Sequence, residues 1–288
     1  MRRLLIIGCG DVVRRALPQL VLRWHVLALV RQRDPQLAAL GVTQIEGDLD
    51  LPGTLKRLAG ISDAVIHSAP PPPQGTGDTR TRNLLAILRR GKSLPRQLVY
   101  ISTSGVYGDC GGARVSETRV PAAQSARAAR RVDAERRLRQ FGRQRGRRCR
   151  VSILRAPGIY AADRLPLQRL RQGLPLMLAA EDSHTNHIHA DDLGRACIAA
   201  LQRGRPNRVY NINDDSALAM GEWFDALADA FALPRAPRLP REQVRRAVPP
   251  LQWSFMNESR RMDNTRMKRE LRLRLRYPTV AAGIPAAL

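Results

Sequence analysis

Apolar residues open the chain as one short block and then recur at a different spacing. Residues 4–7, Leu-Leu-Ile-Ile, form an uninterrupted aliphatic run, which is typical of a buried strand. The apolar residues of segment 13–20 then fall at positions i, i+3, i+4 and i+7, the spacing of one face of an α-helix. Gly8-Cys9-Gly10 separates the two patterns, so the sequence predicts a strand, a glycine turn and a helix.

The same alternation continues through the first two-thirds of the chain. Further apolar runs bounded by turn residues predict strands, and longer segments with helical spacing lie between them. This order predicts an α/β fold with a doubly wound parallel sheet, followed by a small C-terminal lobe that is rich in proline and arginine. The predicted strands are His25–Val30, Val42–Glu46, Asp63–His67, Gln97–Ile101, Arg150–Leu154 and Arg208–Ile212, and the predicted helices are Thr79–Arg90, Ser125–Phe141 and Met220–Phe231.

The glycine turn lies where open α/β folds bind the pyrophosphate of a dinucleotide. Gly8 allows a tight turn, and Gly10 lets the backbone come close to a phosphate group. The helix that starts at Asp11-Val12-Val13 offers unpaired N–H groups and the positive end of its dipole to that anion. Val13 stands where the usual third glycine would lie, so we expect the helix to sit further from the strand. An ordinary strand–helix turn that requires glycine is the alternative.

The choice of cofactor depends on the end of the second strand. An acidic residue there binds the ribose 2′-hydroxyl of NAD. This chain has Arg31-Gln32-Arg33 instead, and a guanidinium group suits the 2′-phosphate of NADP. We therefore expect NADP, bound by Arg31 and Arg33. Asp34 leaves NAD possible, and a solvated run of charges is the remaining interpretation.

Two later strands end in residues that suit a ligand. The strand ending at His67 runs into Ser68-Ala69-Pro70 and three further prolines, which stop the strand and stiffen a loop. The strand ending at Ile101 runs into Ser102-Thr103-Ser104, whose hydroxyls can hydrogen-bond a substrate alcohol or carbonyl group. Ligands of open α/β sheets bind at the carboxyl ends of the strands, so we expect both segments at the cleft.

The formal net charge of +24 bears on the choice of partner. Such a charge is compatible with nucleic acid, an acidic membrane surface or anionic substrates. The cations are nearly all arginine and are spread along the whole chain, and aromatic residues that could stack on bases are few. We therefore interpret the charge as compositional bias and expect no specific nucleic-acid partner.

Hydropathy and cysteine usage limit the location of the protein. No apolar run reaches the ~20 residues needed to span a bilayer, and the first run is too short for a signal peptide. The cysteines are scattered and have no metal-ligand spacing, so we expect free thiols, no metal and a cytoplasmic protein. They are Cys9, Cys110, Cys149 and Cys197.

Six segments, in order, resemble the extended short-chain dehydrogenase/reductase superfamily, specifically its NAD(P)-dependent epimerase/dehydratase class. The resemblance implies a Rossmann sheet, with Asp48 and Leu49 at the adenine, Thr103 and Ser104 as catalytic hydroxyls, and Pro157 under the nicotinamide. The chain's ending, through Leu275-Arg276-Tyr277-Pro278, resembles most the atypical YeeZ-type group. The six segments are Gly8-Cys9-Gly10, Gly47-Asp48-Leu49, Ser102 to Gly108, Leu154 to Tyr160, His187 to Leu193 and Val209 to Ile212.

The chain departs from that family on the helix after the Ser/Thr strand. The family carries Tyr-x-x-x-Lys there, in which the tyrosine exchanges the substrate proton and the lysine lowers its pKa. Alignment on Glu135 puts Arg127 at the tyrosine position and Arg131 at the lysine position. Apolar residues at 134, 138 and 141 continue the same helical stripe, so we expect both arginines to face the cleft. Arginine stays protonated, so it can bind an anionic group but cannot transfer the proton.

Other side chains are candidates for acid–base work. Tyr107 is close in sequence to Thr103, and His184, His187 and His189 form a cluster of groups that titrate in the useful range. A structural role is the alternative for each of them. Asp191-Asp192, which follows the cluster, predicts a helix N-cap.

Together these features predict a dinucleotide-binding domain over 1–158 and a smaller substrate-side lobe over 159–288, from which 187–212 returns to the sheet. The leading hypothesis is an atypical NAD(P)-dependent oxidoreductase or epimerase/dehydratase-like protein acting on a small metabolite. Thr103 would hydrogen-bond the reacting oxygen, and Arg127 and Arg131 would hold an anionic group. The alternative is a non-catalytic NADP-binding or sensing protein. Basic residues on the two helices that usually form the dimer predict a monomer, or a dimer through another surface.

Overall fold

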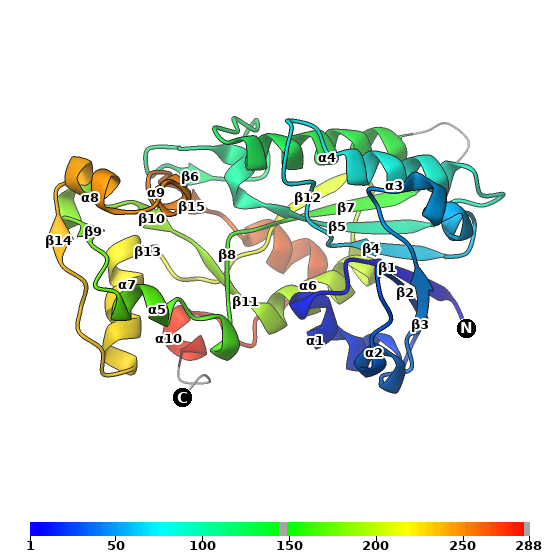
Figure 1. Ribbon diagram of the computed structural model, residues 1–288, viewed down its shortest axis with the longest axis horizontal. Helices are drawn as coiled ribbons and strands as arrows, with labels where there is room; N and C mark the ends of the chain where they lie inside the picture. The colour runs from blue at the N-terminus through cyan, green and yellow to red at the C-terminus, as the bar shows by residue number, and fades with distance from the viewer. Residues whose placement is uncertain (144–148, 285–288) are drawn as a thin grey trace.

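A seven-stranded sheet runs through the larger part of the molecule (Figure 1). The computed structural model describes residues 1–143 and 149–284. Every neighbouring pair of strands in the sheet is parallel, which confirms the predicted fold class. The strands lie in the order β12 (Arg208–Asn211), β7 (Arg150–Ala156), β5 (Gln97–Thr103), β4 (Ala64–His67), β1 (Arg3–Ile7), β2 (His25–Val30) and β3 (Thr43–Glu46).

Helices cover both faces of the sheet, which explains why its strands are apolar without alternation. On β1, Leu4 and Ile6 pack in one hydrophobic cluster while Leu5 and Ile7 pack in the other. The first cluster includes residues of α1 (Asp11–Leu20) and α6 (Ala190–Arg203). The second lies under α3 (Thr79–Arg89), α4 (Ala126–Gly142) and the 3₁₀ segment η1 (Pro52–Leu58) (Figure 1).

The sheet reverses its strand order beside β1, and this places the site. β2 lies on one side of β1 and β4 on the other, so a crevice forms where their following loops diverge. Gly8 follows β1, and Ser68 follows β4. The backbone N–H groups of Ser68 and Ala69 donate to the carbonyl oxygen of Ile7 at 2.8 and 3.0 Å, which ties the two loops together.

The C-terminal lobe is built from short elements around its own apolar cluster, which includes Trp223, Phe224 and Leu227. Paired short strands link segments that are distant in sequence: β8 (Gly158–Tyr160) with β11 (His187–His189), β9 (Leu176–Met177) with β14 (Arg238–Leu239), β10 (His184–Thr185) with β13 (Leu218–Ala219), and β6 (Arg114–Val115) with β15 (Arg261–Met262). The lobe helices are α5 (Leu167–Arg171), α7 (Met220–Ala230), α8 (Arg241–Ala247), α9 (Pro250–Met256) and α10 (Val280–Gly283).

Segment 187–212 connects the two parts of the molecule. β11 pairs with β8 outside the main sheet, α6 then covers one face of that sheet, and β12 forms its edge. The predicted aspartate N-cap of α6 is wrong: His189 is the N-cap, and its Nδ1 accepts from the N–H of Asp191 at 3.2 Å. Asp192 instead accepts from the N–H groups of Arg276 and Tyr277, both at 2.8 Å, and so anchors the C-terminal segment.

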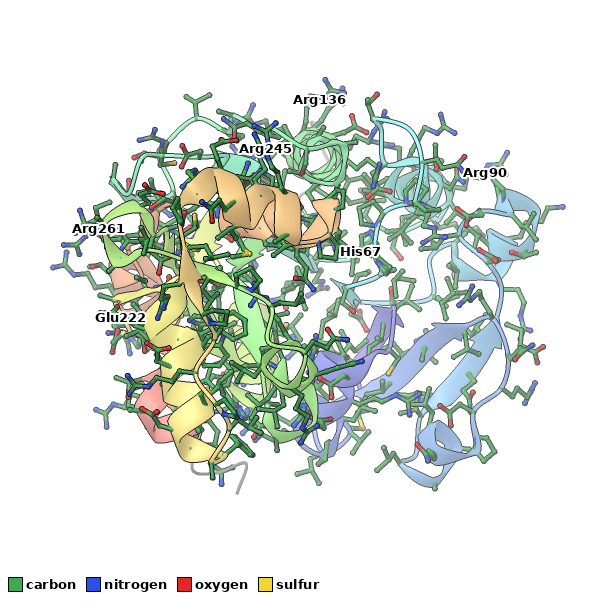
Figure 2. All side chains as sticks on the ribbon, turned by 60° about the vertical axis from the view of Figure 1, so that its left-hand side comes forward. His67, Arg90, Arg136, Glu222, Arg245 and Arg261 are labelled. Carbon is green, nitrogen blue, oxygen red and sulfur yellow. The ribbon has the colours of Figure 1, made fainter. Side chains whose placement is uncertain are left out.

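Arginines project from many parts of the surface. Figure 2 shows Arg90, Arg136 and Arg261 at the edges of the molecule, on elements that are distant in sequence. The positive charge is therefore distributed over the fold instead of forming a single basic tail. Within residues 1–143 and 149–284, no helix has the length and apolar character needed to cross a membrane.

Candidate functional site

A cleft of about 930 Å³ opens at the carboxyl ends of the central strands. The glycine turn and the start of α1 form one wall, and the ends of β5 and β7 form another. The cleft therefore collects segments that the sequence predicts as cofactor contacts. Those that line it are Gly8, Cys9, Gly10, Asp11, Val12, Val13, Arg31, Ser68, Pro70, Ser102 and Pro157, with Thr103 and Arg131 beside them.

The two glycines of the turn serve different purposes. Gly8 has φ +86°, and a Cβ there would lie 2.4 Å from the backbone nitrogen of Ala69, so the fold itself requires glycine. Gly10 has an ordinary φ of −85°, and a Cβ there would meet nothing within 4 Å. Because no protein atom occupies that space, glycine at position 10 leaves the N-terminus of α1 open to a ligand. An anion such as a pyrophosphate fits this cradle.

The start of α1 is bound to the C-terminal lobe through charge. Asp11 accepts from Arg15 Nε at 2.8 Å and from Arg164 Nη1 at 2.9 Å. Arg164 belongs to the lobe and also lines the cleft, a contact that sequence reasoning missed.

Val13 faces the core, while close helix packing occurs elsewhere on α1: a Cβ at Gly194 of α6 would lie 3.0 Å from the carbonyl oxygen of Val12. Burial raises the pKa of the Cys9 thiol to about 11.

A smaller cavity of about 210 Å³ continues the cleft beyond Gly8. Asp48 and Leu49, together with Ala69 and Pro70, line it beside the aliphatic side chain of Leu29. The cavity therefore brings together the residues that the resemblance assigns to the adenine. Arg31 lines both this cavity and the main cleft.

The arginines after β2 have different surroundings. Arg31 lines the cleft, whereas Arg33 is turned to Glu46, with Nε 2.7 Å from the carboxylate, and does not line it. Asp34 lines the cleft but forms an ion pair with Arg14 and caps α2 (Pro35–Ala39) by accepting from the N–H of Gln36. The hydrogen bond from Arg14 lowers the pKa of Asp34. Arg14 itself lies one helical turn after Gly10, a position whose contact with Asp34 only the fold reveals.

At the other end of the cleft, the strand-end hydroxyls are already hydrogen-bonded to the protein. Ser102 Oγ donates to Glu135 Oε1 at 2.7 Å, and Thr103 Oγ1 accepts from the N–H of Gly105 at 3.2 Å. Arg131 Nη1 donates to the Tyr100 hydroxyl and to the Ile101 carbonyl, both at 2.9 Å. Thr103 keeps its hydroxyl hydrogen available for a substrate oxygen, because Oγ1 acts as an acceptor in its bond to Gly105.

A buried ion pair lies beneath Ser102. Arg155 is 0% exposed, and its Nε and Nη2 donate to Glu135 at 3.0 and 2.7 Å. The carboxylate is thus shared between a guanidinium group and the Ser102 hydroxyl. Sequence reasoning used Glu135 only as an alignment anchor, because its partner lies 20 residues away on β7 and no local spacing marks the pair.

A second cavity of about 450 Å³ lies between the cleft and the C-terminal lobe. It adjoins the cleft, because Pro157, Ile159 and Arg164 line both. Aromatic side chains form much of its wall, and polar groups from both parts of the molecule reach it. Its lining includes Ser104, Tyr160, His184, His187, Trp223, Phe224, Phe255, Glu258 and Arg260.

The two arginines that the resemblance aligns with the family's Tyr and Lys positions are separated. Arg131 lines the cleft as expected, but the Arg127 guanidinium lies 4.0 Å above the ring of Phe255, on α9 of the lobe. Burial lowers the pKa of Arg127. Arg127 therefore joins α4 to α9 at the edge of the second cavity and does not line the cleft.

The remaining acid–base candidates also fall into different settings. Tyr107 lines neither cavity: it is 0% exposed, its hydroxyl donates to Asn211 at 2.6 Å, and Arg155 lies 4.7 Å from its ring. His189 caps α6, as described above. His184 and His187 line the second cavity, each with a buried Nδ1 that has no hydrogen-bond partner. Burial lowers the pKa of His187 to about 3, so His187 is neutral at ordinary pH.

Among the described residues, no cluster of three or more His, Cys, Asp or Glu side chains is arranged to hold a metal ion. All four cysteines are free thiols.

Comparison with known proteins identifies the family. The family described as "NAD dependent epimerase/dehydratase family" matches residues 8–213. A functionally unknown conserved protein from Silicibacter pomeroyi superposes with a TM-score of 0.80 at 25% identity, covering 100% of this chain and 98% of that one. No curated protein matches the sequence.

Two epimerases share the fold at lower identity. The UDP-glucose 4-epimerase of Thermotoga maritima, solved with UDP-glucose, has a TM-score of 0.77 at 17% identity, covering 99% of this chain and 97% of that one. The UDP-glucuronic acid 4-epimerase of Bacillus cereus, solved with NAD, has a TM-score of 0.75 at 18% identity, covering 99% and 95%.

Proposed function

Since this chain belongs to the NAD dependent epimerase/dehydratase family, we propose that it is an oxidoreductase that uses a nicotinamide dinucleotide and lacks the family's proton-transfer pair. The observation that carries the proposal is the open cradle at Gly10, continuous with the cavity at Asp48 and with the Thr103 strand end. When bound there, the cofactor supplies or accepts a hydride. Gly10→Glu should abolish cofactor binding and leave the fold intact, because a Cβ at position 10 meets no protein atom within 4 Å and the added carboxylate repels the pyrophosphate. Equal cofactor affinity in Gly10→Glu would contradict this.

NADP is the preferred cofactor in this proposal. Arg31 lines the cleft, and within residues 1–143 and 149–284 it forms no ion pair, while Asp34 is neutralised by Arg14. Arg31→Ala should weaken NADP binding by roughly 1.5–3 kcal/mol, the range for a hydrogen bond to a charged group, and should leave NAD binding nearly unchanged. Arg33→Ala is the matched control, because Arg33 does not line the cleft. Titration of both cofactors checks this, and an NAD preference in the unmodified protein would contradict it.

We infer that the substrate is a compact hydroxy or keto compound with an apolar ring and an acidic group. The aromatic wall of the second cavity suits the ring, and Arg131 suits the acid. A sugar nucleotide is a poorer fit, because the cations at the second cavity are already engaged. Arg260 Nε donates to the Gly108 carbonyl at 3.0 Å and the same side chain pairs with Glu258, and Arg164 pairs with Asp11.

His184 takes the place of the missing tyrosine in this proposal. In the direction of ketone reduction, the bound cofactor would supply the hydride to the carbonyl carbon. His184 would donate a proton to the carbonyl oxygen, and the Thr103 hydroxyl would hydrogen-bond that oxygen. An imidazole can act as a general acid in such a step, whereas the guanidinium of Arg131 cannot. Tyr107, the other candidate, donates its hydroxyl to Asn211 and takes no part in this step.

Phenylpyruvate with NADPH, and UDP-glucose with the oxidised cofactor, test the activity. We expect oxidation of NADPH with phenylpyruvate, read from the absorbance of the reduced nicotinamide. We expect no epimerisation of UDP-glucose, read by chromatography of the sugar nucleotide. His184→Ala should lower kcat by roughly 10²–10⁴-fold, the usual contribution of a general acid. His25→Ala, an exposed histidine outside both cavities, is its control. Turnover of UDP-glucose near the usual median of ~10 s⁻¹ would contradict the proposal.

A non-catalytic NADP-binding or sensing protein is the second candidate. The observation that favours it is the engagement of Arg127 by Phe255, which joins the Rossmann part to the lobe where the family has its acid–base residue. Under this alternative, NADPH binds with the Arg31 dependence given above, and His184→Ala changes nothing because no compound is turned over.

A further inference from the structure

A second basic concavity lies away from the cleft. It is a groove of about 500 Å³ formed by the C-terminal end of α1, the outer face of α6 and the segment after the π-helical turn η5 (Met267–Leu271). Five arginines line it, and among the described residues no Asp or Glu does. We name it the basic groove; its arginines are Arg23, Arg195, Arg203, Arg272 and Arg274.

Of these five arginines, only Arg195 is paired with a carboxylate within the described part of the chain, at 2.7 Å from Asp192. Arg203 Nε donates to the neutral carbonyl oxygen of Leu271 at 2.6 Å, which leaves its charge uncompensated. In that part of the chain, no ion pair involves Arg23, Arg272 or Arg274 either. Like charges gathered in one concavity repel each other, so their convergence costs stability unless an anion binds there.

The backbone directs Arg272 and Arg274 outward. Leu271 and Leu273 are buried in the core cluster under α6, which leaves the arginines that alternate with them exposed. Arg272 also has φ +51°, in the left-handed region that favours glycine. Non-glycine residues held in this strained backbone conformation recur at ligand sites.

We propose that the basic groove binds a small compound that carries two or more adjacent phosphates. Guanidinium groups match phosphate oxygens in pairs, and the volume is that of a small-molecule site. Leu22, which is 79% exposed, and Ile198 add an apolar surface to the groove. The site is separate from the cofactor cleft, because the two share no lining residue and lie at opposite ends of α1.

Calorimetric titration with tripolyphosphate near physiological salt tests the proposal on the full chain. The Gly10→Glu variant closes the phosphate cradle of the cleft, so binding that persists in this variant belongs elsewhere. In that background Arg272→Gly and Arg274→Gln should each weaken binding about tenfold or more, the loss of one charge-assisted hydrogen bond. Arg272→Gly removes the backbone strain, so its melting temperature should be equal to or above that of the parent, which separates lost binding from lost folding.

Two further measurements distinguish a specific phosphate site from a diffuse effect of net charge and from a nucleic-acid surface. Arg57→Gln and Arg90→Gln remove the same charge from exposed positions outside the groove and should leave binding unchanged. Equal weakening by these controls would overturn the proposal, because it would show a diffuse effect of net charge. Tighter binding of a single-stranded DNA oligonucleotide than of tripolyphosphate would also overturn it, in favour of a nucleic-acid surface.

Discussion

Removing the carboxylate of Glu135 should destabilise the protein more than any single change on its surface. Glu135→Ala leaves the guanidinium of Arg155, which is 0% exposed, without its counter-ion. An uncompensated buried charge of this kind costs about 3–5 kcal/mol. Ser102 Oγ also loses its acceptor at 2.7 Å, which adds about 1 kcal/mol. The expected loss is therefore about 4–6 kcal/mol.

Thermal and urea unfolding, followed by circular dichroism, measure this loss. At about 2–4 °C per kcal/mol, the melting temperature should fall by roughly 10–20 °C. Glu135→Gln keeps an acceptor but loses the charge, so it should lie between wild type and Glu135→Ala. Glu46→Ala breaks the Arg33 pair, whose side chains are 74% and 54% exposed, and should cost at most about 1 kcal/mol.

The double change Glu135→Leu with Arg155→Met separates the ion pair from its desolvation. Replacing both charges with apolar groups of similar size is often close to neutral, so this variant should recover most of the stability that Glu135→Ala loses. A Glu135→Ala protein that is no less stable than Glu46→Ala would refute the reasoning. It would mean that water reaches Arg155.

Three further predictions concern pH, assembly and polyanions. Burial raises the pKa of Asp214 from 3.8 to about 7, so between these pH values the folded form keeps a proton that the unfolded chain releases. The free energy of unfolding should therefore fall, by about 4 kcal/mol at most, as pH rises from about 4 to 7. Asp214→Asn should flatten this fall. Light scattering should show a monomer, because the outward faces of α3 and α4 carry Arg82 and Arg136; a dimer that Ala86→Asp dissociates would argue against this. Mixed-sequence DNA should bind at low salt and dissociate steeply as salt rises, and sequence-selective binding near physiological salt would contradict it.

The sequence predicted best what depends on local pattern. β2 has the predicted bounds, and the requirement for glycine at position 8 followed from a turn between a strand and a helix. Arg31 was placed at the cleft for the same reason, because it directly follows a well-marked strand. Arg33, two residues later, was predicted there too, but its side chain forms an ion pair with Glu46 on the neighbouring strand β3 and does not line the cleft.

Long-range contacts could not be read from spacing. The pair between Glu135 and Arg155 joins a helix to a strand, and the contact between Arg127 and Phe255 joins the two parts of the molecule. In the C-terminal lobe the predicted helix Met220–Phe231 is confirmed as α7. The rest of the lobe gave no predicted helices, because its strands of two or three residues and its other helices of four to seven leave little periodic signal. Leu84 and Leu88 of α3 are 0% and 1% exposed, so they belong to the core and are not available for a dimer surface.

The two arginines that the resemblance aligns with the family's acid–base pair have consequences that neither has alone. Arg131 is fixed by two oxygens, from Tyr100 and Ile101, so its charge stays in the cleft whatever the substrate. The Arg127 guanidinium instead lies 4.0 Å from the ring of Phe255. Position 127, which the resemblance aligns with the family's proton-exchanging tyrosine, therefore joins α4 to α9 in this chain. A tyrosine restored at 127 would meet an aromatic ring where the family's tyrosine meets substrate, and it would also remove a contact between the two parts. Under the proposed function, proton transfer therefore falls to the lobe side of the second cavity, where His184 lies.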